Sequence, residues 1–290
     1  MSGILLIDKP TGWTSHDVVA KLRGRLGTRR IGHAGTLDPM ATGLLVLAIG
    51  PATRILKYLD LEPKEYRFTV RFGIETDTQD ADGETVAERP VPNDLDSRLR
   101  DVLIHFLGEI QQIPPMYSAV KVEGQPLYKY ARKGQEVERE ARDVTVYSLE
   151  IDSVSEVSAA MKCVCSGGTY VRTLAHDIGQ MIGCGAHVTA LTRTGVGRFR
   201  QEQATTIEAA SPDDFIPLSE ALEPMPVIRL KDGQARVIQH GNFLRFDNTP
   251  NEPLAALADE DGTVFAVARV VENELHPECV LPLEATHGAV

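Results

Sequence analysis

The 290-residue sequence lacks the features of a membrane-anchored chain or of a chain cross-linked by disulfide bonds. It has only four cysteines and one tryptophan, and no apolar stretch approaches the 18 residues of a membrane span. Its start lacks the basic flank and apolar run of a signal peptide. With 42% hydrophobic and 24% charged residues, the chain is predicted to be a cytoplasmic globular protein with a sizeable core and no membrane segment.

Cysteine and histidine show no spacing typical of a metal site. Cys163 and Cys165 are the one close pair, and in an alternating stretch their thiols share one face of a strand, a poor geometry for zinc. The eight histidines form no HxxxH or HExxH pair. We therefore expect buried, reduced thiols and no bound metal.

Positive charge is scarce overall: the sequence has 30 basic and 41 acidic residues, which gives a net charge of −11. The excess acid lies beyond residue 200, where 5 basic and 16 acidic residues occur, whereas the first two hundred residues hold 25 of each. Residues 21–30 contain five basic residues and no acid, and residues 193–200 contain three more basic residues. These two runs predict a local basic surface that suits RNA phosphates, with solvated helix and loop charges as the alternative.

The apolar periodicity predicts strands and helices without regular alternation. Residues 66–72 alternate strictly, which places Tyr66 at the end of an inward-facing row on a strand. Residues 14–27 are typical of a helix, because Thr14 or Ser15 can cap it and apolar residues recur every four positions. The mixture favours an α+β fold over a doubly wound sheet. Further strands are expected at 3–8, 44–49, 144–151, 159–165 and 187–194, and further helices around 97–108 and within 166–183.

The chain is predicted to divide near residue 210. Four prolines punctuate residues 211–226, which indicates a Pro-rich linker. Residues 227–290 contain short strand-like runs separated by turns, enough for a compact β-rich module. Residues 114–143 mix aromatic and charged side chains, a composition that suits a protruding segment. We therefore expect a main domain over residues 1–210 that carries this segment as an insertion.

The stretch GHAGTLDPMATGLL, residues 32–45, is the most unusual in the chain. Its three glycines permit a tight turn or close approach to a ligand, and Asp38 is its only acid. An Asp-Pro pair is also a common turn opening or helix cap, which is the structural alternative. The loop has neither the GxxxxGK[ST] pattern nor the serine of a GxSxG elbow, so phosphoryl and acyl transfer are disfavoured.

Five motifs together resemble one enzyme family. LLIDKPTGWTS, GHAGTLDPMATGLL, KEYRF, PPMYSAVK and SGGTYVRTLAHDIG follow the order and spacing of bacterial TruB-type pseudouridine synthases, through roughly residues 3–200. The resemblance implies a catalytic domain with a mixed, largely antiparallel central sheet flanked by helices. It also implies a thumb-like insertion at about 114–143 and a PUA-like RNA-binding domain at 227–290.

The activity implied by this resemblance is isomerisation of uridine 55 in the T-loop of tRNA. The uridine flips out of the folded loop, its ribose C1′–N1 bond breaks, the uracil turns over and C1′ is rejoined to C5. A hydrolytic glycosidase generally needs two carboxylates, whereas here the base stays in the pocket and one carboxylate suffices. The reaction is redox-neutral and uses no phosphate donor, so we expect neither an organic cofactor nor a metal.

The resemblance also assigns roles to single residues. It makes Asp38 the catalytic carboxylate, which either adds to C1′ or removes the C2′ proton, and Arg172 its ionic partner. Tyr66 matches the tyrosine that stacks on the uracil. The other matches are Tyr170 and Leu191 in the pocket, His33 in place of the extruded bases, and Lys9, which orders the pocket loops.

Three alternatives use the same residues differently. A non-catalytic RNA-binding protein on this scaffold would lack the carboxylate or its arginine, and a nucleoside hydrolase or glycosidase would need a second acid. A synthase for another RNA, such as a guide-directed ribosomal RNA enzyme, is disfavoured by the short N-terminus and the protruding segment. We therefore expect a monomeric enzyme whose partner is tRNA, with the C-terminal module on the acceptor stem.

Overall fold

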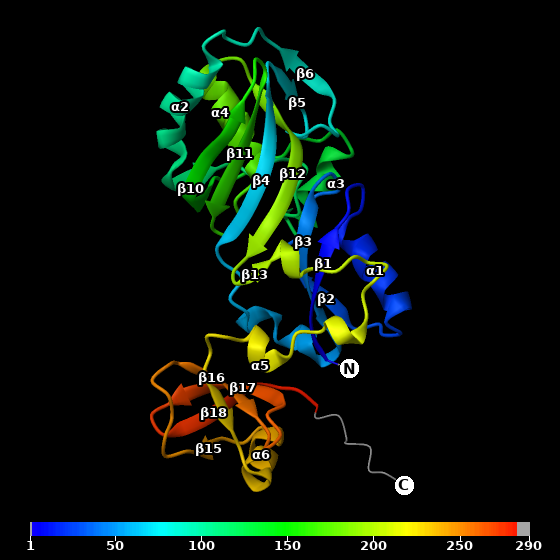
Figure 1. Ribbon diagram of the computed structural model, residues 1–290, viewed down its shortest axis with the longest axis vertical. Coiled ribbons are helices and arrows are strands. Elements are labelled where there is room, and N and C mark those ends of the chain that lie inside the picture. Colours follow the sequence, from blue (N-terminus) through cyan, green and yellow to red (C-terminus); the bar gives the residue numbers. More distant parts are fainter. Residues whose placement is uncertain (1, 283–290) are drawn as a thin grey trace.

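The computed structural model describes residues 2–282, so the last eight residues of the predicted module 227–290 lie outside it. Figure 1 shows a large mixed sheet with helices and a smaller C-terminal sheet beneath it. The large sheet runs β1 (Gly3–Lys9), β3 (Thr42–Ile49), β12 (Ala186–Val196), β4 (Lys64–Phe72), β11 (Ser158–Cys165), β10 (Arg142–Val154) and β7 (Gly108–Gln112). Two strands lie off this path: β2 (Ile31–Ala34) on β3 and β13 (Phe199–Arg200) on β12.

Strand direction in this sheet agrees with the predicted class. Among the described residues, the pairing of β12 with β3 is parallel and every other pairing in the sheet is antiparallel. The α+β prediction with a mixed, largely antiparallel sheet is therefore confirmed. Within residues 2–282 no helix has the length and apolar character needed to cross a membrane.

Helix α1 (Ser15–Arg25) begins where the sequence predicts. The Thr14 hydroxyl accepts a hydrogen bond from the Asp17 backbone N–H at 3.1 Å, and the Asp17 carboxylate accepts one from the Thr14 N–H at 2.9 Å. Its Val18 and Leu22 are fully buried, whereas the five basic side chains of residues 21–30 are exposed. The first basic run therefore lies on the surface.

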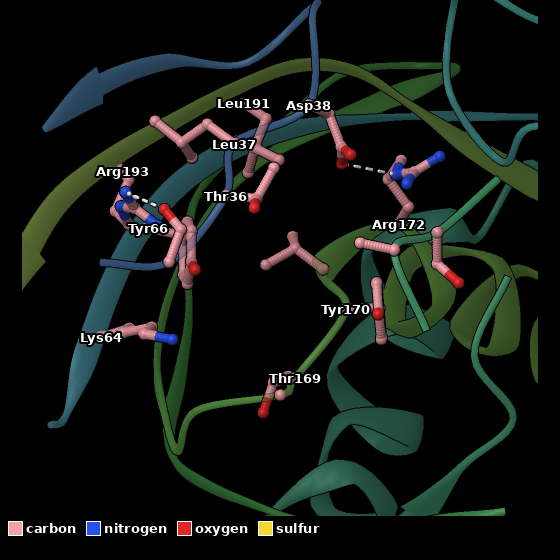
Figure 2. Close-up of a pocket in the computed structure, with 15 residues that line it drawn as sticks. Thr36, Leu37, Asp38, Lys64, Tyr66, Thr169, Tyr170, Arg172, Leu191 and Arg193 are labelled. Atoms are coloured by element: carbon pink, nitrogen blue, oxygen red, sulfur yellow. Dashed lines mark hydrogen bonds and ion pairs between the residues drawn. The ribbon is translucent and has the colours of Figure 1, made fainter. Parts of the chain in front are cut away.

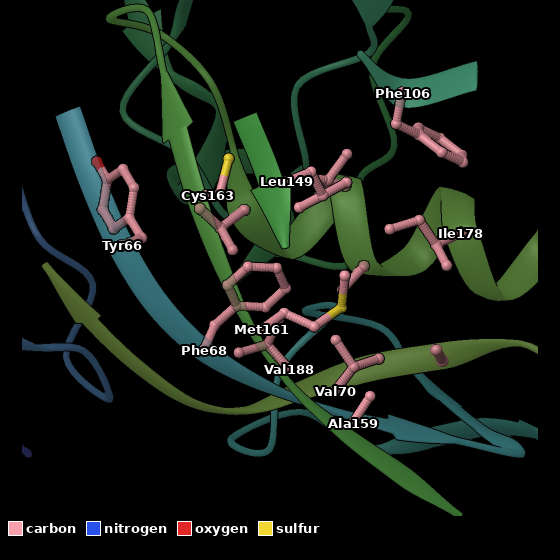
Figure 3. Close-up of a cluster of buried hydrophobic side chains, with 14 of the residues drawn as sticks. Tyr66, Phe68, Val70, Phe106, Leu149, Ala159, Met161, Cys163, Ile178 and Val188 are labelled. Atoms are coloured by element: carbon pink, nitrogen blue, oxygen red, sulfur yellow. The ribbon is translucent and has the colours of Figure 1, made fainter. Parts of the chain in front are cut away.

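Strand β4 supplies the alternating row that the sequence predicts. Phe68, Val70 and Phe72 point into a core cluster against α2 (Leu95–Leu103) and α4 (Val171–Ile182), as Figure 3 shows for part of the cluster. Tyr66 ends the row opposite Cys163 of β11. The predicted alternation is confirmed, and it places the Tyr66 phenol where the apolar core gives way to loops. All four cysteines are buried and unpaired, as predicted.

Residues 73–143 hold the smaller elements around this core. A two-stranded sheet of β5 (Ile74–Thr76) and β6 (Thr85–Glu88) follows β4. The predicted thumb-like segment 114–143 contains a second small sheet of β8 (Lys121–Val122) and β9 (Gln125–Pro126), and the short helix α3 (Leu127–Ala131). Within this segment Leu127 is fully buried.

The C-terminal module is a five-stranded sheet with a helix. Its order is β14 (Val227–Arg229), β16 (Leu254–Ala258), β17 (Val264–Val271), β18 (Glu274–Val280) and β15 (Leu244–Arg245). The expectation that residues 227–246 form only strands and turns was wrong, because residues 232–239 form helix α6 (Asp232–Gln239). Ala235 and Ile238, three residues apart, bury one face of this helix, and that spacing is helical rather than alternating.

The segment 211–226, predicted as a linker, packs against the main sheet. Ile216 and Ile4 exchange two backbone hydrogen bonds of 3.0 and 2.8 Å. Helix α5 (Leu218–Ala221) joins a core cluster that spans both sheets. In that cluster Leu44 of β3 and Val267 of β17 both take part, so the two sheets share one apolar core.

Gly43 allows β3 and β12 to meet closely, and this contact yields a stability prediction. Its φ is +95°, and a Cβ there would lie 2.4 Å from the Arg193 carbonyl oxygen. We expect Gly43→Ala to lower the free energy of unfolding by about 2 kcal/mol or more. The control is Gly24→Ala on exposed α1, which meets open space and should raise it by about 0.5–1 kcal/mol. Urea denaturation measures both, and equal stabilities would contradict the prediction.

Candidate active site

One cavity of about 260 Å³ collects most of the predicted site residues. It lies between the β2–β3 loop, β4, β12 and the start of α4 (Figure 2). Asp38, Tyr66, Tyr170, Arg172 and Leu191 line it, whereas Lys9 and His33 do not. Residues that lie more than 150 positions apart in the sequence therefore meet in one pocket.

An ion pair joins the two central residues. Arg172 Nε lies 2.9 Å from Asp38 Oδ2, and the arginine side chain is only 3% exposed. The Asp38 side chain is 32% exposed and lines the cavity, so it is accessible to a ligand there. The other Arg172 nitrogens donate to Asp80 Oδ2 at 3.0 Å and to the carbonyls of Thr78 and Tyr117, both at 2.8 Å. The guanidinium is thus held from several sides.

Asp80 is a site residue that the sequence analysis missed. Its side chain is 5% exposed, and its carboxylate accepts hydrogen bonds from the Thr78 hydroxyl at 2.5 Å and the Asp82 backbone N–H at 3.1 Å. It belongs to an acidic, turn-rich stretch between β5 and β6. The only available signal was the density of Asp and Thr in that stretch, which does not single out one residue.

Two opposing influences set the protonation of Asp38. Burial raises the pKa of its carboxyl group above the usual range, the positive charge of Arg172 opposes this rise, and the negative charge of Asp80 adds to it. Arg172 therefore favours the ionised form of a carboxyl group whose desolvated pocket favours the protonated form.

Tyr66 has a buried basic partner. The Arg193 side chain, 1% exposed, hydrogen-bonds the Tyr66 phenol, and it donates to the carbonyls of Leu44 at 2.8 Å and Gly35 at 3.1 Å. Burial raises the pKa of Tyr66 to about 12, and Arg193 opposes that rise. The phenol is therefore neutral near neutral pH and fixed in orientation.

The prediction that residues 193–200 form part of a free, phosphate-binding surface was wrong. Arg193 is buried and points into the cavity wall. Arg198 pairs with Glu223 at 2.7 Å, and Arg200 pairs with Glu65 at 3.2 Å. A basic residue looks the same in sequence whether its charge faces solvent or an internal acceptor, so charge counting could not separate these cases.

Lys9 ties the cavity loops together without lining the cavity. Its side chain is fully buried, and its ammonium donates to the carbonyls of Pro10 at 3.0 Å, Trp13 at 2.6 Å and Pro39 at 3.2 Å. Burial lowers its pKa to about 8. Because Pro39 follows Asp38 directly, Lys9 fixes the backbone that carries the carboxylate.

The remaining predicted residues take different positions. Tyr170 precedes α4, where its backbone N–H donates to the Gln112 side chain at 2.9 Å, and Leu191 is a buried residue of β12. His33 lies on β2, with its ring edge-on to His16 at 5.4 Å between centroids. Its Nδ1 is buried without a hydrogen-bond partner among the described residues. No cluster of three or more metal-binding side chains occurs within residues 2–282.

Comparisons with known proteins agree on one family. A family model described as TruB family pseudouridylate synthase (N terminal domain) matches residues 23–171, and one described as tRNA pseudouridylate synthase B C-terminal domain matches residues 172–225. A tRNA pseudouridine synthase B from Thermobifida fusca is 45% identical over 288 residues, which cover 96% of this chain and 98% of the relative. The chain belongs to the TruB family of pseudouridine synthases. The predicted isomerase class is therefore confirmed.

Further TruB relatives and solved structures extend this finding. A tRNA pseudouridine synthase B from Opitutus terrae is 52% identical over 76% of this chain and 90% of the relative. The fold resembles an H/ACA RNP bound to a substrate RNA containing 2′-deoxyuridine, with a TM-score of 0.70 and 23% identity over 97% of this chain and 85% of that chain. The fold also resembles a Cbf5-Nop10-Gar1 complex, with a TM-score of 0.67 and 26% identity over 97% of this chain and 84% of that chain. The shared fold includes the C-terminal sheet, because these matches cover nearly the whole chain.

The two neighbours of Asp38 should move its pKa in opposite directions. Asp80→Asn keeps an oxygen for Arg172 but removes a negative charge, so we expect the Asp38 pKa to fall. Arg172→Gln removes the opposing positive charge, so the Asp38 pKa should rise further. A ¹³C NMR titration of the aspartate carboxyl carbons measures both shifts. Asp17, in the exposed cap of α1, is the internal control and should not move, and shifts of the same sign in both variants would contradict this account.

Proposed function

We propose that this TruB-family protein isomerises uridine 55 in the T-loop of tRNA, with Asp38 as its catalytic carboxylate. Asp38 is the one acidic residue among those described around the cavity, and this observation carries the assignment. The family supports a tRNA pseudouridine synthase. A hydrolase would need a second carboxylate at the sugar, and Asp80 is buried against Arg172 rather than exposed in the cavity.

In this proposal the flipped uridine enters the cavity with its uracil against the Tyr66 ring and its ribose at Asp38. The carboxylate either adds to C1′ or removes the C2′ proton, and both routes require it to be ionised. The C1′–N1 bond breaks, the uracil turns over and a C1′–C5 bond forms. The proton on C5 is lost and N1 gains one, so the product is an isomer of the substrate.

The surface around the cavity favours RNA as the partner. The exposed basic residues of 21–30 lie on the second half of α1 and on the turn that leads into β2, which carries His33. Phosphate contacts of this kind give affinity and orientation. We propose that His33 takes the space of the extruded bases, that residues 114–143 close over the T-arm, and that the PUA-like module 227–290 contacts the acceptor stem. The protein would act in the cytoplasm as a monomer, without a cofactor.

Asp38→Asn tests the catalytic assignment. Because the amide can neither attack C1′ nor take a proton, we expect pseudouridine formation at position 55 to fall by at least three orders of magnitude, with tRNA affinity within about threefold. Chemical mapping of pseudouridine in an unmodified tRNA transcript measures turnover, and filter binding measures affinity. Substantial turnover by the variant would remove Asp38 from the chemistry.

The same carboxylate should set the acidic side of the pH profile. Since burial raises the Asp38 pKa, kcat/KM should fall as pH decreases through that raised value. Arg172→Gln raises the pKa again, so its loss of activity should begin at a higher pH than in the wild type. An acidic limb that stays in place in this variant would show that another group controls it.

The basic run makes a prediction about salt. If Arg29 and Arg30 contact phosphates, Arg29→Ala/Arg30→Ala should weaken binding of every tRNA and flatten the slope of log affinity against log salt by roughly 1 to 2. The modified position should not change. The matched control is Arg98→Ala/Arg100→Ala, which removes two charges from exposed α2, where each pairs with an aspartate one turn away. Equal slopes in both double variants would show that residues 21–30 form only a solvated helix end.

A further inference from the structure

The three cations that line the cavity differ in what they bind. Arg172 is engaged by Asp38, Asp80 and two carbonyls, and Arg193 by two carbonyls and the Tyr66 phenol. Lys64 lines the same cavity, yet its ammonium makes no hydrogen bond or ion pair with any residue from 2 to 282. It is therefore the cation whose three donors are available to a ligand.

The ammonium of Lys64 lies at a gap between two loops. A Cβ on Gly35, in the β2–β3 loop, would lie 3.7 Å from Lys64 Nζ. One on Gly167, in the β11–α4 loop, would lie 3.4 Å from Lys64 Nζ and 2.6 Å from Glu62 Oε1. Because Lys64 and Tyr66 are two residues apart on β4, their side chains share one face of the strand. Figure 2 shows the Lys64 side chain directed into the cavity, on the other side from Asp38.

The charges around the cavity are unevenly divided. At the Asp38 end, one arginine lies between two carboxylates. At the other end, Arg193 and Lys64 lie near each other without a carboxylate in contact. Glu62 is near enough to raise the Lys64 pKa, yet burial and the charge of Arg193 lower it overall. An anion at Lys64 would relieve this unfavourable placement of two cations.

A flipped uridine brings such an anion, because its ribose and uracil are neutral and its charge lies on the adjoining phosphodiesters. The phosphodiesters are bonded to the ribose, which this pose puts at Asp38, so one of them reaches the Lys64 ammonium only if the strand leaves the cavity past β4. We propose that Lys64 binds a phosphate next to the target uridine and so anchors the flipped nucleotide in the cavity. This inference rests on the proposed function.

Charge removal at Lys64 gives the first test. We expect Lys64→Gln to raise the RNA concentration for half-maximal single-turnover rate about tenfold, with the saturated rate within about twofold. The salt slope of binding to an unmodified T-arm stem-loop should fall by about 0.7, the value for one single-strand phosphate contact. Lys64→Arg should restore both quantities. Arg67→Gln is the matched control, because Arg67 lies on the same strand with its side chain exposed on the opposite face.

Neutral methylphosphonate linkages on either side of the target uridine give the second test. In the wild type, one of the two linkages should weaken RNA binding about tenfold. In Lys64→Gln the same linkage should cause little further loss of affinity, because the substitution and the linkage remove the same contact. Fully additive losses would overturn the proposal. So would a reduced saturated rate with an unchanged salt slope, which would place Lys64 on the uracil.

Two further outcomes separate the possible failures. If Lys64→Gln does not fold, the wild type still decides, because tolerance of a methylphosphonate on both sides of the uridine would exclude the anchor. If the wild type forms no pseudouridine in unmodified tRNA, the proposed function itself fails. Normal turnover by the wild type, together with a Lys64→Gln variant that binds and reacts like it, contradicts only the role of Lys64.

Discussion

The buried guanidinium of Arg172 is the interaction on which the cavity depends. It brings together helix α4, the Asp38 loop, the Asp80 loop and the backbone of Tyr117 in segment 114–143. A buried cation is tolerated only when its donors and its charge are satisfied, and here two carboxylates and two carbonyls do so. The Asp38 loop and segment 114–143 are therefore placed by the same side chain.

This arrangement explains which parts of the site the sequence could predict. Asp38 and Tyr66 stand in local motifs, a glycine-rich loop with one acid and a strictly alternating strand, so their local structure was predictable. Asp80 and Arg193 have no such local mark, because their roles come from partners 92 and 127 or more residues away in the chain. Helix α6 was missed for a related reason, since its short apolar face is also compatible with turns between strands.

Burial affects the protonation of the residues at the two ends of the cavity differently. At Asp38, desolvation disfavours the charged form, and Arg172 opposes this effect while the pKa stays above its usual value. At Tyr66, desolvation keeps the phenol neutral, and Arg193 fixes its direction without ionising it. One low-polarity pocket thus holds a carboxyl group and a neutral tyrosine, and each of them has an arginine partner that other parts of the fold hold in place.

Strand β3 connects this pocket to the surfaces proposed for RNA. Both of its faces are buried: Leu45 and Leu47 pack toward α1, whereas Leu44 and Val46 share a core with the C-terminal sheet. At its start, Gly43 meets Arg193 at the cavity wall. Because both faces of the strand are closely packed, it has little freedom to move relative to the elements on either side. The basic helix α1, the C-terminal module and the cavity therefore pack against one strand, which sets the distance between the surfaces proposed for RNA and Asp38.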